Sequence, residues 1–161
     1  MNAAQWMDHA LALAEEAAAA GEIPVGAVIA DRDGRIIGRG SNRRESADDP
    51  LGHAELIAIA EAARAMGDWR LEGTTMVVTL EPCAMCAGAL VNARVDRLIF
   101  GAYDPKAGFC GSLGNLVQDA RLNHRLEVVG GFEEDRARAL LQRFFQQLRK
   151  GSIETERWQS G

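Results

Sequence analysis

Three residues of metal-ligand type stand in two short motifs. His53 opens an H-x-E motif, and Cys83 and Cys86 form a C-x-x-C motif that begins 30 residues further along the chain. One imidazole and two thiolates make a nitrogen and sulfur donor set suited to Zn²⁺. Only three protein ligands are evident, which leaves the fourth tetrahedral position for water. This pattern is typical of a catalytic zinc site, because structural zinc sites fill all four positions with protein.

Glu55 follows His53 by two residues. Residues two apart do not face the same side of a helix, so Glu55 is a poor candidate for the fourth ligand. A carboxylate close to a metal-activated water can take its proton, and can then deliver protons to a reacting nitrogen and to a leaving amine. The two motifs together predict water activation with proton shuttling.

Two other interpretations fit parts of the pattern. A C-x-x-C motif alone is also typical of a thioredoxin-like dithiol, but such a dithiol needs no H-x-E motif. A structural zinc site needs a fourth ligand. The candidates for it by residue type alone are Cys110, His124 and His9.

The length and composition favour one globular domain over residues 1–161, with a polar tail over about 151–161. The chain has 161 residues, of which 47% are hydrophobic and 25% charged, as expected for a soluble globular protein. The longest apolar run, 23–30, is far shorter than the roughly 18–20 residues of a membrane span. The first residues lack the basic start of a secretory signal. We therefore expect a cytoplasmic protein without a membrane segment.

Helical and strand-like segments alternate along the chain. Helical patterns cover residues 3–20, 53–66, 83–92, 116–122 and 133–150, and strand-like patterns cover 25–30, 35–40, 74–80, 95–100 and 126–129. The turn residues Asp31–Gly34 predict a hairpin between the first two strands. An α/β domain follows, with helices on both faces of a mixed sheet and loops over 41–52 and 101–114.

The two motifs match the H-x-E…P-C-x-x-C signature of the zinc-dependent nucleoside and nucleobase deaminases. Further segments resemble the bacterial tRNA-specific adenosine deaminases, and the loop that begins at Phe100 is the most specific of them. These segments are Gly21–Val28, Gly40–Asn42, Asp49–Pro50, Phe100–Gly108, Gly111–Leu113 and Leu122–Arg125. The resemblance thus extends over nearly the whole chain.

The resemblance implies a fold, a reaction and an assembly. The fold is a three-layer α/β/α domain with a mixed five-stranded sheet, as in cytidine deaminases. The reaction is the hydrolytic deamination of adenosine to inosine at the wobble position of a tRNA anticodon, usually that of arginine tRNA. The enzymes of the family are homodimers with one Zn²⁺ per subunit, and zinc-activated water attacks C6 of an adenine extruded from the anticodon loop.

The resemblance also implies roles for individual residues. His53, Cys83 and Cys86 match the zinc ligands, and Glu55 matches the proton shuttle. Four further residues match positions that contact substrate: Asn42 and the backbone around Ala54 bind the extruded base, and Asp104 and Lys106 lie near the flanking nucleotides. For these four the alternative is that they cap turns or face solvent.

The charge of the chain departs from what a tRNA-binding enzyme leads one to expect. The net charge is −5, and the segment after the last helix is acidic, which argues against broad, nonspecific binding of nucleic acid. The candidates for a local basic patch are Arg43, Arg44, Arg70 and Arg121.

Two alternative functions therefore stay open: a deaminase of a free base such as guanine or cytosine, and a noncatalytic zinc-stabilised RNA-binding module. Glu55 argues against the second, because a structural zinc site has no use for that carboxylate.

Overall fold

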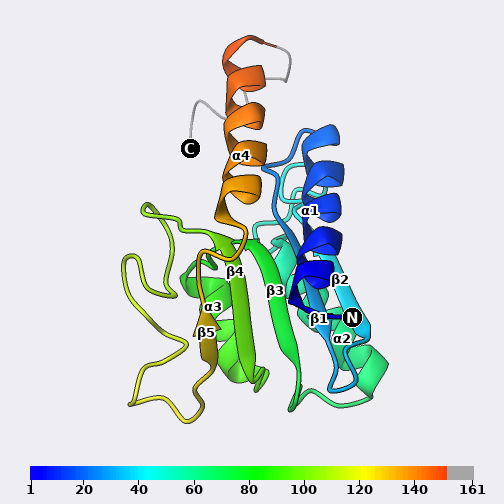
Figure 1. Cartoon of the computed structure of the whole chain (residues 1–161), viewed down its shortest axis with the longest axis vertical. Coiled ribbons are helices and arrows are strands. Elements are labelled where there is room, and N and C mark those ends of the chain that lie inside the picture. The colour runs from blue at the N-terminus through cyan, green and yellow to red at the C-terminus, as the bar shows by residue number, and fades with distance from the viewer. Residues whose placement is uncertain (152–161) are drawn as a thin grey trace.

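The computed structural model describes residues 1–151 (Figure 1). In chain order the elements are α1 (Ala3–Ala19), β1 (Gly26–Ala30), β2 (Ile36–Ser41), α2 (Ala54–Met66), β3 (Thr75–Leu80), α3 (Ala84–Asn92), β4 (Arg97–Ala102), β5 (Glu127–Val129) and α4 (Glu134–Arg149). Of the tail predicted over 151–161, all but the first residue lies outside the described part.

The strands form one mixed sheet in the order β2-β1-β3-β4-β5. β1 is antiparallel to both β2 and β3, whereas β3, β4 and β5 are parallel. β1 and β2 form the predicted hairpin, whose turn is stabilised by the Asp31 carboxylate. Its Oδ1 accepts the backbone N–H groups of Asp33 and Arg35 at 2.9 and 3.0 Å. The five-stranded mixed sheet is the one that the resemblance predicted.

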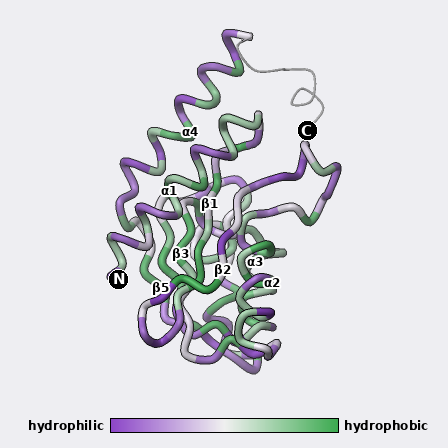
Figure 2. Tube along the Cα trace, turned by 90° about the vertical axis from the view of Figure 1, so that its right-hand side faces the viewer, coloured by the Kyte–Doolittle hydropathy of each residue, from purple (hydrophilic) through white to green (hydrophobic). Residues whose placement is uncertain are grey.

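Helices cover both faces of the sheet (Figure 1). The strands alternate their side chains between two cores, as period-two geometry requires. In β1, Ala27 and Ile29 pack with residues of α2 and α3, whereas Val28 and Ala30 pack with residues of α1 and α4. Figure 2 shows the resulting hydrophobic strands between more hydrophilic outer segments. The predicted three-layer α/β/α architecture is confirmed.

α2 lies very close to β2 because two glycines face it. A Cβ atom on Gly40 would lie 2.1 Å from the carbonyl oxygen of Ala54, and one on Gly38 would lie 2.3 Å from that of Ala58. Both separations are shorter than any real contact of a Cβ atom, so only glycine allows this approach. The close packing holds the first turn of α2 beside the end of β2.

The short helix predicted over 116–122 is wrong. This segment consists of turns and bends. Val117 is fully buried, and its carbonyl accepts the N–H of Leu126 at 2.9 Å. The Asp119 carboxylate accepts both the backbone N–H and the guanidinium of Arg121. Such local bonds from Asp side chains compete with helical hydrogen bonding.

The last helix, α4, extends beyond the end of the sheet (Figure 1). Its buried residues are Ala137, Leu140 and Phe144, and the neighbouring Phe145 is 37% exposed. Within residues 1–151, no helix combines the length and the apolar character that a bilayer crossing requires.

Candidate active site

Two helix N-termini meet at one end of the sheet. His53 is the N-cap residue of α2 and Cys83 that of α3, both with extended backbone, and neither helix has a side-chain cap hydrogen bond. His53 therefore precedes the first helical turn. The sequence pattern had predicted that it lies within that turn. β3 ends at Leu80, directly before the segment that leads to Cys83. Both N-terminal dipole ends favour negative charge in the space between the helices.

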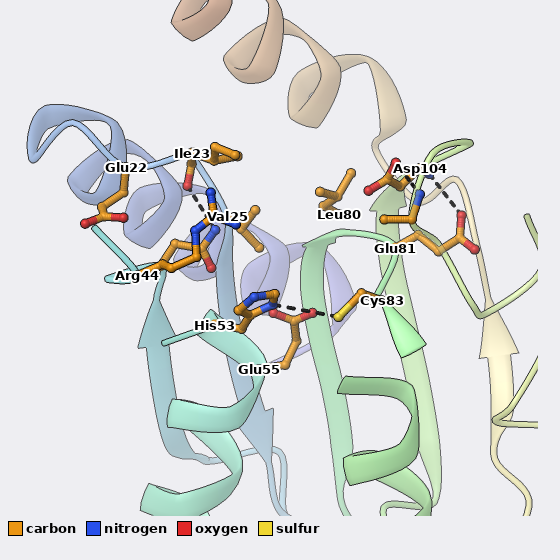
Figure 3. Close-up of a pocket in the computed structure, with 12 residues that line it drawn as sticks. Glu22, Ile23, Val25, Arg44, His53, Glu55, Leu80, Glu81, Cys83 and Asp104 are labelled. Atoms are coloured by element: carbon orange, nitrogen blue, oxygen red, sulfur yellow. Dashed lines mark hydrogen bonds between the residues drawn. The ribbon is translucent and has the colours of Figure 1, made fainter. Parts of the chain in front are cut away.

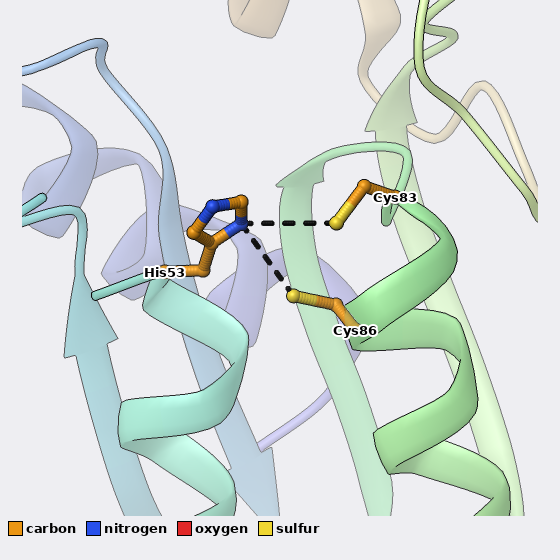
Figure 4. A group of neighbouring side chains, drawn as sticks. All are labelled: His53, Cys83 and Cys86. Carbon is orange, nitrogen blue, oxygen red and sulfur yellow. Dashed lines mark hydrogen bonds between the residues drawn. The ribbon is translucent and has the colours of Figure 1, made fainter. Parts of the chain in front are cut away.

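The structure brings the three predicted metal ligands together (Figure 4). Nδ1 of His53 lies 3.8 Å from Sγ of Cys83 and 3.6 Å from Sγ of Cys86. All three donor atoms lie within 4.8 Å of one another. Tetrahedral bonds of about 2.05 Å to nitrogen and 2.3 Å to sulfur separate the two atoms by about 3.6 Å. The donor set and its spacing therefore suit a zinc ion.

No fourth ligand joins this cluster within residues 1–151. Cys110 is buried elsewhere, with its thiol near the carbonyl of Pro82, and burial raises the pKa of that thiol. Nε2 of His124 lies 2.7 Å from the carbonyl oxygen of Val95, and His9 is exposed on α1. A closed structural zinc site thus finds no support in the described part of the chain.

The charges of the three side chains are coupled. The side-chain hydrogen bond from Cys86, and then that from His53, lowers the pKa of Cys83 to about 4. The same bond to Cys83 raises the pKa of Cys86. Hydrogen bonding to Cys83 also raises the pKa of His53. The cluster therefore favours a thiolate, the form of a cysteine side chain that binds metal.

Glu55 lies in the first turn of α2 beside the cluster (Figure 3). The residue is only 4% exposed. Burial raises the pKa of its carboxyl to about 7, partly offset by a backbone hydrogen bond and by the charge of His53. A carboxyl group with such a pKa can both accept and donate a proton near neutral pH.

These groups border a small pocket of about 190 Å³ (Figure 3). Its walls mix aliphatic side chains with acidic, amide and guanidinium groups. The lining residues are Glu22, Ile23, Val25, Asn42, Arg44, His53, Glu55, Leu80, Glu81, Cys83, Asp104 and Ala107.

Of the four predicted substrate-contact residues, the structure brings two side chains to the pocket. Asn42 lines it, accepts the N–H of Ala54 at 3.0 Å and donates to the carbonyl of Ile23 at 3.2 Å. Asp104 lines it too, and its Oδ1 caps a turn by accepting the N–H groups of Lys106 and Ala107. Lys106 is exposed outside the lining, and the N–H of Ala54 is occupied by Asn42.

Sequence reasoning missed two buried acidic residues that line the pocket. Glu22 is 1% exposed and Glu81 is 2% exposed. Burial by itself raises the pKa of Glu81, but hydrogen bonds from Ser112, Asp104 and Cys110 outweigh it, so this pKa lies below its ordinary value. Glu22 stands in a segment that carries the family resemblance and Glu81 directly precedes the P-C-x-x-C motif, but an acidic residue beside a strand or turn is usually exposed.

Comparisons with known proteins agree on a family. The sequence model of the MafB19-like deaminases matches residues 1–149. A tRNA-specific adenosine deaminase of Bacillus subtilis is 49% identical over 145 residues, which span 90% of this chain and 89% of the relative. One from Haemophilus influenzae is 46% identical over 144 residues, which span 89% and 83%.

Solved structures give the same picture. A structure from a study of A-to-I editing by tRNA:A34 deaminases superposes with a TM-score of 0.82 at 39% identity, over 86% of this chain and 99% of the other. A guanine deaminase from Nitrosomonas europaea superposes with a TM-score of 0.75 at 26% identity, over 86% and 82%. The matching family model and these relatives, together with the fold and the site geometry, show where the chain belongs. It is a member of the deaminase family and, within it, of the tRNA-specific adenosine deaminases.

Proposed function

We propose that this protein hydrolytically deaminates adenosine to inosine at the wobble position of a tRNA anticodon. The observation that carries the proposal is the three-donor cluster of His53, Cys83 and Cys86, with the buried carboxyl group of Glu55 beside it in a pocket. The identity of up to 49% to tRNA-specific adenosine deaminases supports the choice of substrate.

His53 Nδ1 and the two thiolates would hold one zinc ion per chain. Bound there, zinc supplies Lewis-acid activation of water. Glu55 takes a proton from the attacking water, whose oxygen adds to C6 of the adenine. The same carboxyl group delivers that proton to the ring nitrogen, then takes the second proton from the hydroxyl group now on C6 and passes it to the departing amine. The carbon–nitrogen bond breaks, ammonia leaves and inosine remains.

The pocket admits a base only after it has left the stack of the anticodon loop. Leu80 and Val25 contribute aliphatic contacts in the pocket, and Asn42 contributes an amide for the edge of the base. Asp104 lines the pocket and Lys106 is exposed outside it, and we propose that both contact the flanking nucleotides. Single-stranded loops are recognised in this way, through unstacked bases and their edges.

The remaining features of the proposal follow from the family. The whole chain is one deaminase domain, and it acts as a homodimer on the arginine tRNA in the cytoplasm. The three proposed zinc ligands all come from a single chain.

The test is to incubate the zinc-loaded protein with arginine tRNA that carries adenosine at the wobble position, and to sequence the anticodon loop. We expect inosine at this position alone. Parallel reactions with free guanine and free cytosine measure ammonia release. The structural likeness to a guanine deaminase makes these the appropriate competitors.

Activity on the free bases without inosine in the tRNA would contradict the proposed substrate. RNA binding without any deamination, by protein that contains zinc, would instead indicate a noncatalytic module. Protein with Glu55→Ala serves as the control for adventitious deamination in both arms.

A further inference from the structure

Two buried carboxylates line the pocket from opposite sides without belonging to the metal cluster. Glu22 is 1% exposed and follows α1, and Glu81 is 2% exposed and follows β3. Figure 3 shows them on either side of His53 and Cys83. Burying a carboxylate is costly unless hydrogen bonds replace its water, so the partners of each group indicate what it stabilises.

Glu81 binds one loop, residues 104–112, through four hydrogen bonds. Its Oε1 accepts the N–H of Asp104 at 2.9 Å and the hydroxyl of Ser112 at 2.5 Å. Its Oε2 accepts the N–H groups of Cys110 at 3.1 Å and of Ser112 at 3.0 Å. No helix or strand of this loop accepts hydrogen bonds from these backbone N–H groups. The Glu81 carboxylate accepts them instead.

The loop is held tightly against Glu81 and the start of α3. A Cβ atom on Gly108 would lie 2.3 Å from Cδ of Glu81, so a side chain there would displace the Glu81 carboxylate. The N–H of Phe109 binds the carbonyl of Pro82 at 2.9 Å, and Gly108 pairs with Cys83 in a β-bridge. Glu81 thereby fixes the wall of the pocket that contains Asp104.

Glu22 binds the loop on the other side, residues 43–52. Its two carboxylate oxygens accept the N–H of Glu45 at 3.0 Å and that of Ser46 at 2.6 Å. This loop carries Arg44, which lines the pocket. Next to Glu22, the carbonyl of Ile23 accepts the amide of Asn42. The two glutamates thus hold the two loops that border one opening.

We propose that Glu22 and Glu81 are positioning residues that hold these loops ready for an extruded nucleotide, a role that rests on the proposed function. Each carboxylate accepts hydrogen bonds at both of its oxygens, whereas a neutral amide offers one acceptor oxygen and a hydrophobic side chain offers none. Loops fixed before binding cost less entropy when the substrate arrives. Releasing them weakens productive binding of RNA more than it slows the chemical step.

The test compares Glu81→Gln and Glu22→Gln with two exposed controls, Glu72→Gln and Glu16→Gln. Glu72 precedes β3 at the opposite end of the strand from Glu81, and Glu16 lies on α1. We expect KM for the tRNA to rise about tenfold in each buried variant, with kcat reduced less than threefold and zinc content unchanged. Both controls keep the KM of the unchanged protein.

Hydrogen exchange of the loop amides gives a readout that needs no activity. We expect Glu81→Gln to speed exchange at Cys110 and Ser112, and Glu22→Gln to speed it at Ser46. Ser112→Ala, which removes one of four bonds to Glu81, gives a smaller rise in KM. Glu81→Asp, which keeps both acceptor oxygens, recovers part of the loss seen with Gln.

Unchanged exchange in the buried variants, or faster exchange with an unchanged KM, would overturn the proposal. A drop in kcat and zinc content with an unchanged KM would do the same, since it indicates damage to the metal site. If Glu81→Gln fails to fold, Ser112→Ala and Glu22→Gln still decide. If the unchanged protein forms no inosine in the tRNA, the proposed function is wrong. The hydrogen-exchange measurements still decide whether the two glutamates hold the loops.

Discussion

At the scale of single residues, the two proposed roles, holding a metal and moving protons, fall to different side chains. His53, Cys83 and Cys86 converge within 4.8 Å. Glu55 lies beside them, buried and with a pKa raised to about 7 by that burial. A carboxyl group in this position can shuttle protons but is not needed for metal binding, so the two functions can be tested separately.

Glu55→Ala is expected to keep its zinc and its fold but to lose turnover. General acid–base catalysis raises reaction rates about 10²–10⁴-fold, so kcat should fall by a factor in this range. The measurement pairs metal analysis with a time course of inosine formation. Turnover close to that of the unchanged protein would rule out the shuttle role.

Cys86→Ser is expected to lower the zinc content well below one ion per chain, because a hydroxyl is a poor substitute for a thiolate ligand. Cys110→Ser is the matched control, since this buried thiol lies outside the cluster. Atomic absorption of the purified variants checks both. Equal zinc in the two variants would contradict the assignment of Cys86.

At the scale of elements, the site depends on how closely α2 lies on β2. His53 and Glu55 are at the start of α2, and Cys83 and Cys86 are at the start of α3. The two starts meet only if each helix lies at a fixed height on the sheet. For α2, Gly40 sets that height through its contact with the Ala54 carbonyl.

Gly40→Ala is expected to destabilise the protein by about 1–3 kcal/mol, as overpacking does, and to weaken zinc binding by displacing the start of α2. Gly88→Ala, inside α3 with open space around it, should be neutral or stabilising by up to about 1 kcal/mol. Urea unfolding and zinc titration check both variants. A Gly40→Ala protein with unchanged zinc affinity would refute this account of the packing.

At the scale of the whole molecule, the three proposed zinc ligands come from two segments that lie 30 residues apart in the chain. The proposed zinc ion would bind only the folded arrangement of His53, Cys83 and Cys86 and would therefore stabilise it. At a thousandfold excess of free zinc over its Kd, the gain in unfolding free energy is about 4 kcal/mol.

Chelation of zinc should therefore lower Tm by roughly 8–16 °C in a domain of this size. Thermal unfolding followed by circular dichroism, with and without a chelator, measures the shift, and added zinc should reverse it. The Cys86→Ser protein is the control, and it should respond little to either. A chelator effect of equal size in that variant would indicate a different metal site.

The net charge of −5 also bears on RNA binding at this scale. Recognition must rely on local cations, and within residues 1–151 Arg44 is the arginine or lysine whose side chain lines the pocket. Arg44→Ala is expected to flatten the plot of log affinity against log salt by about 0.7, the value for one phosphate contact to a single strand. Arg70→Ala, beside the exposed Trp69 ring, should leave the slope unchanged. Equal slopes in all three proteins would exclude a phosphate contact by Arg44.

Much of the fold could be read from local patterns. Hydrophobic periodicity and turn residues indicated the five strands and four of the predicted helices, within two residues at each end. The prediction over 116–122 failed because Asp119 satisfies backbone groups locally and Val117 is buried in a non-helical segment. Hydrophobic periodicity alone does not show whether such side-chain hydrogen bonds or helical backbone hydrogen bonds are more stable.

The sequence by itself determined the chemistry of the donor set, because the identity of His53, Cys83, Cys86 and Glu55 does not depend on the fold. Only the tertiary structure decided that Nδ1 of His53 faces both sulfur atoms, and that Glu22 and Glu81 are buried anchors of the two loops. The physical reason is that spacing along a chain constrains near neighbours. Burial and ligand geometry arise from packing between segments that meet only when the whole sheet has formed.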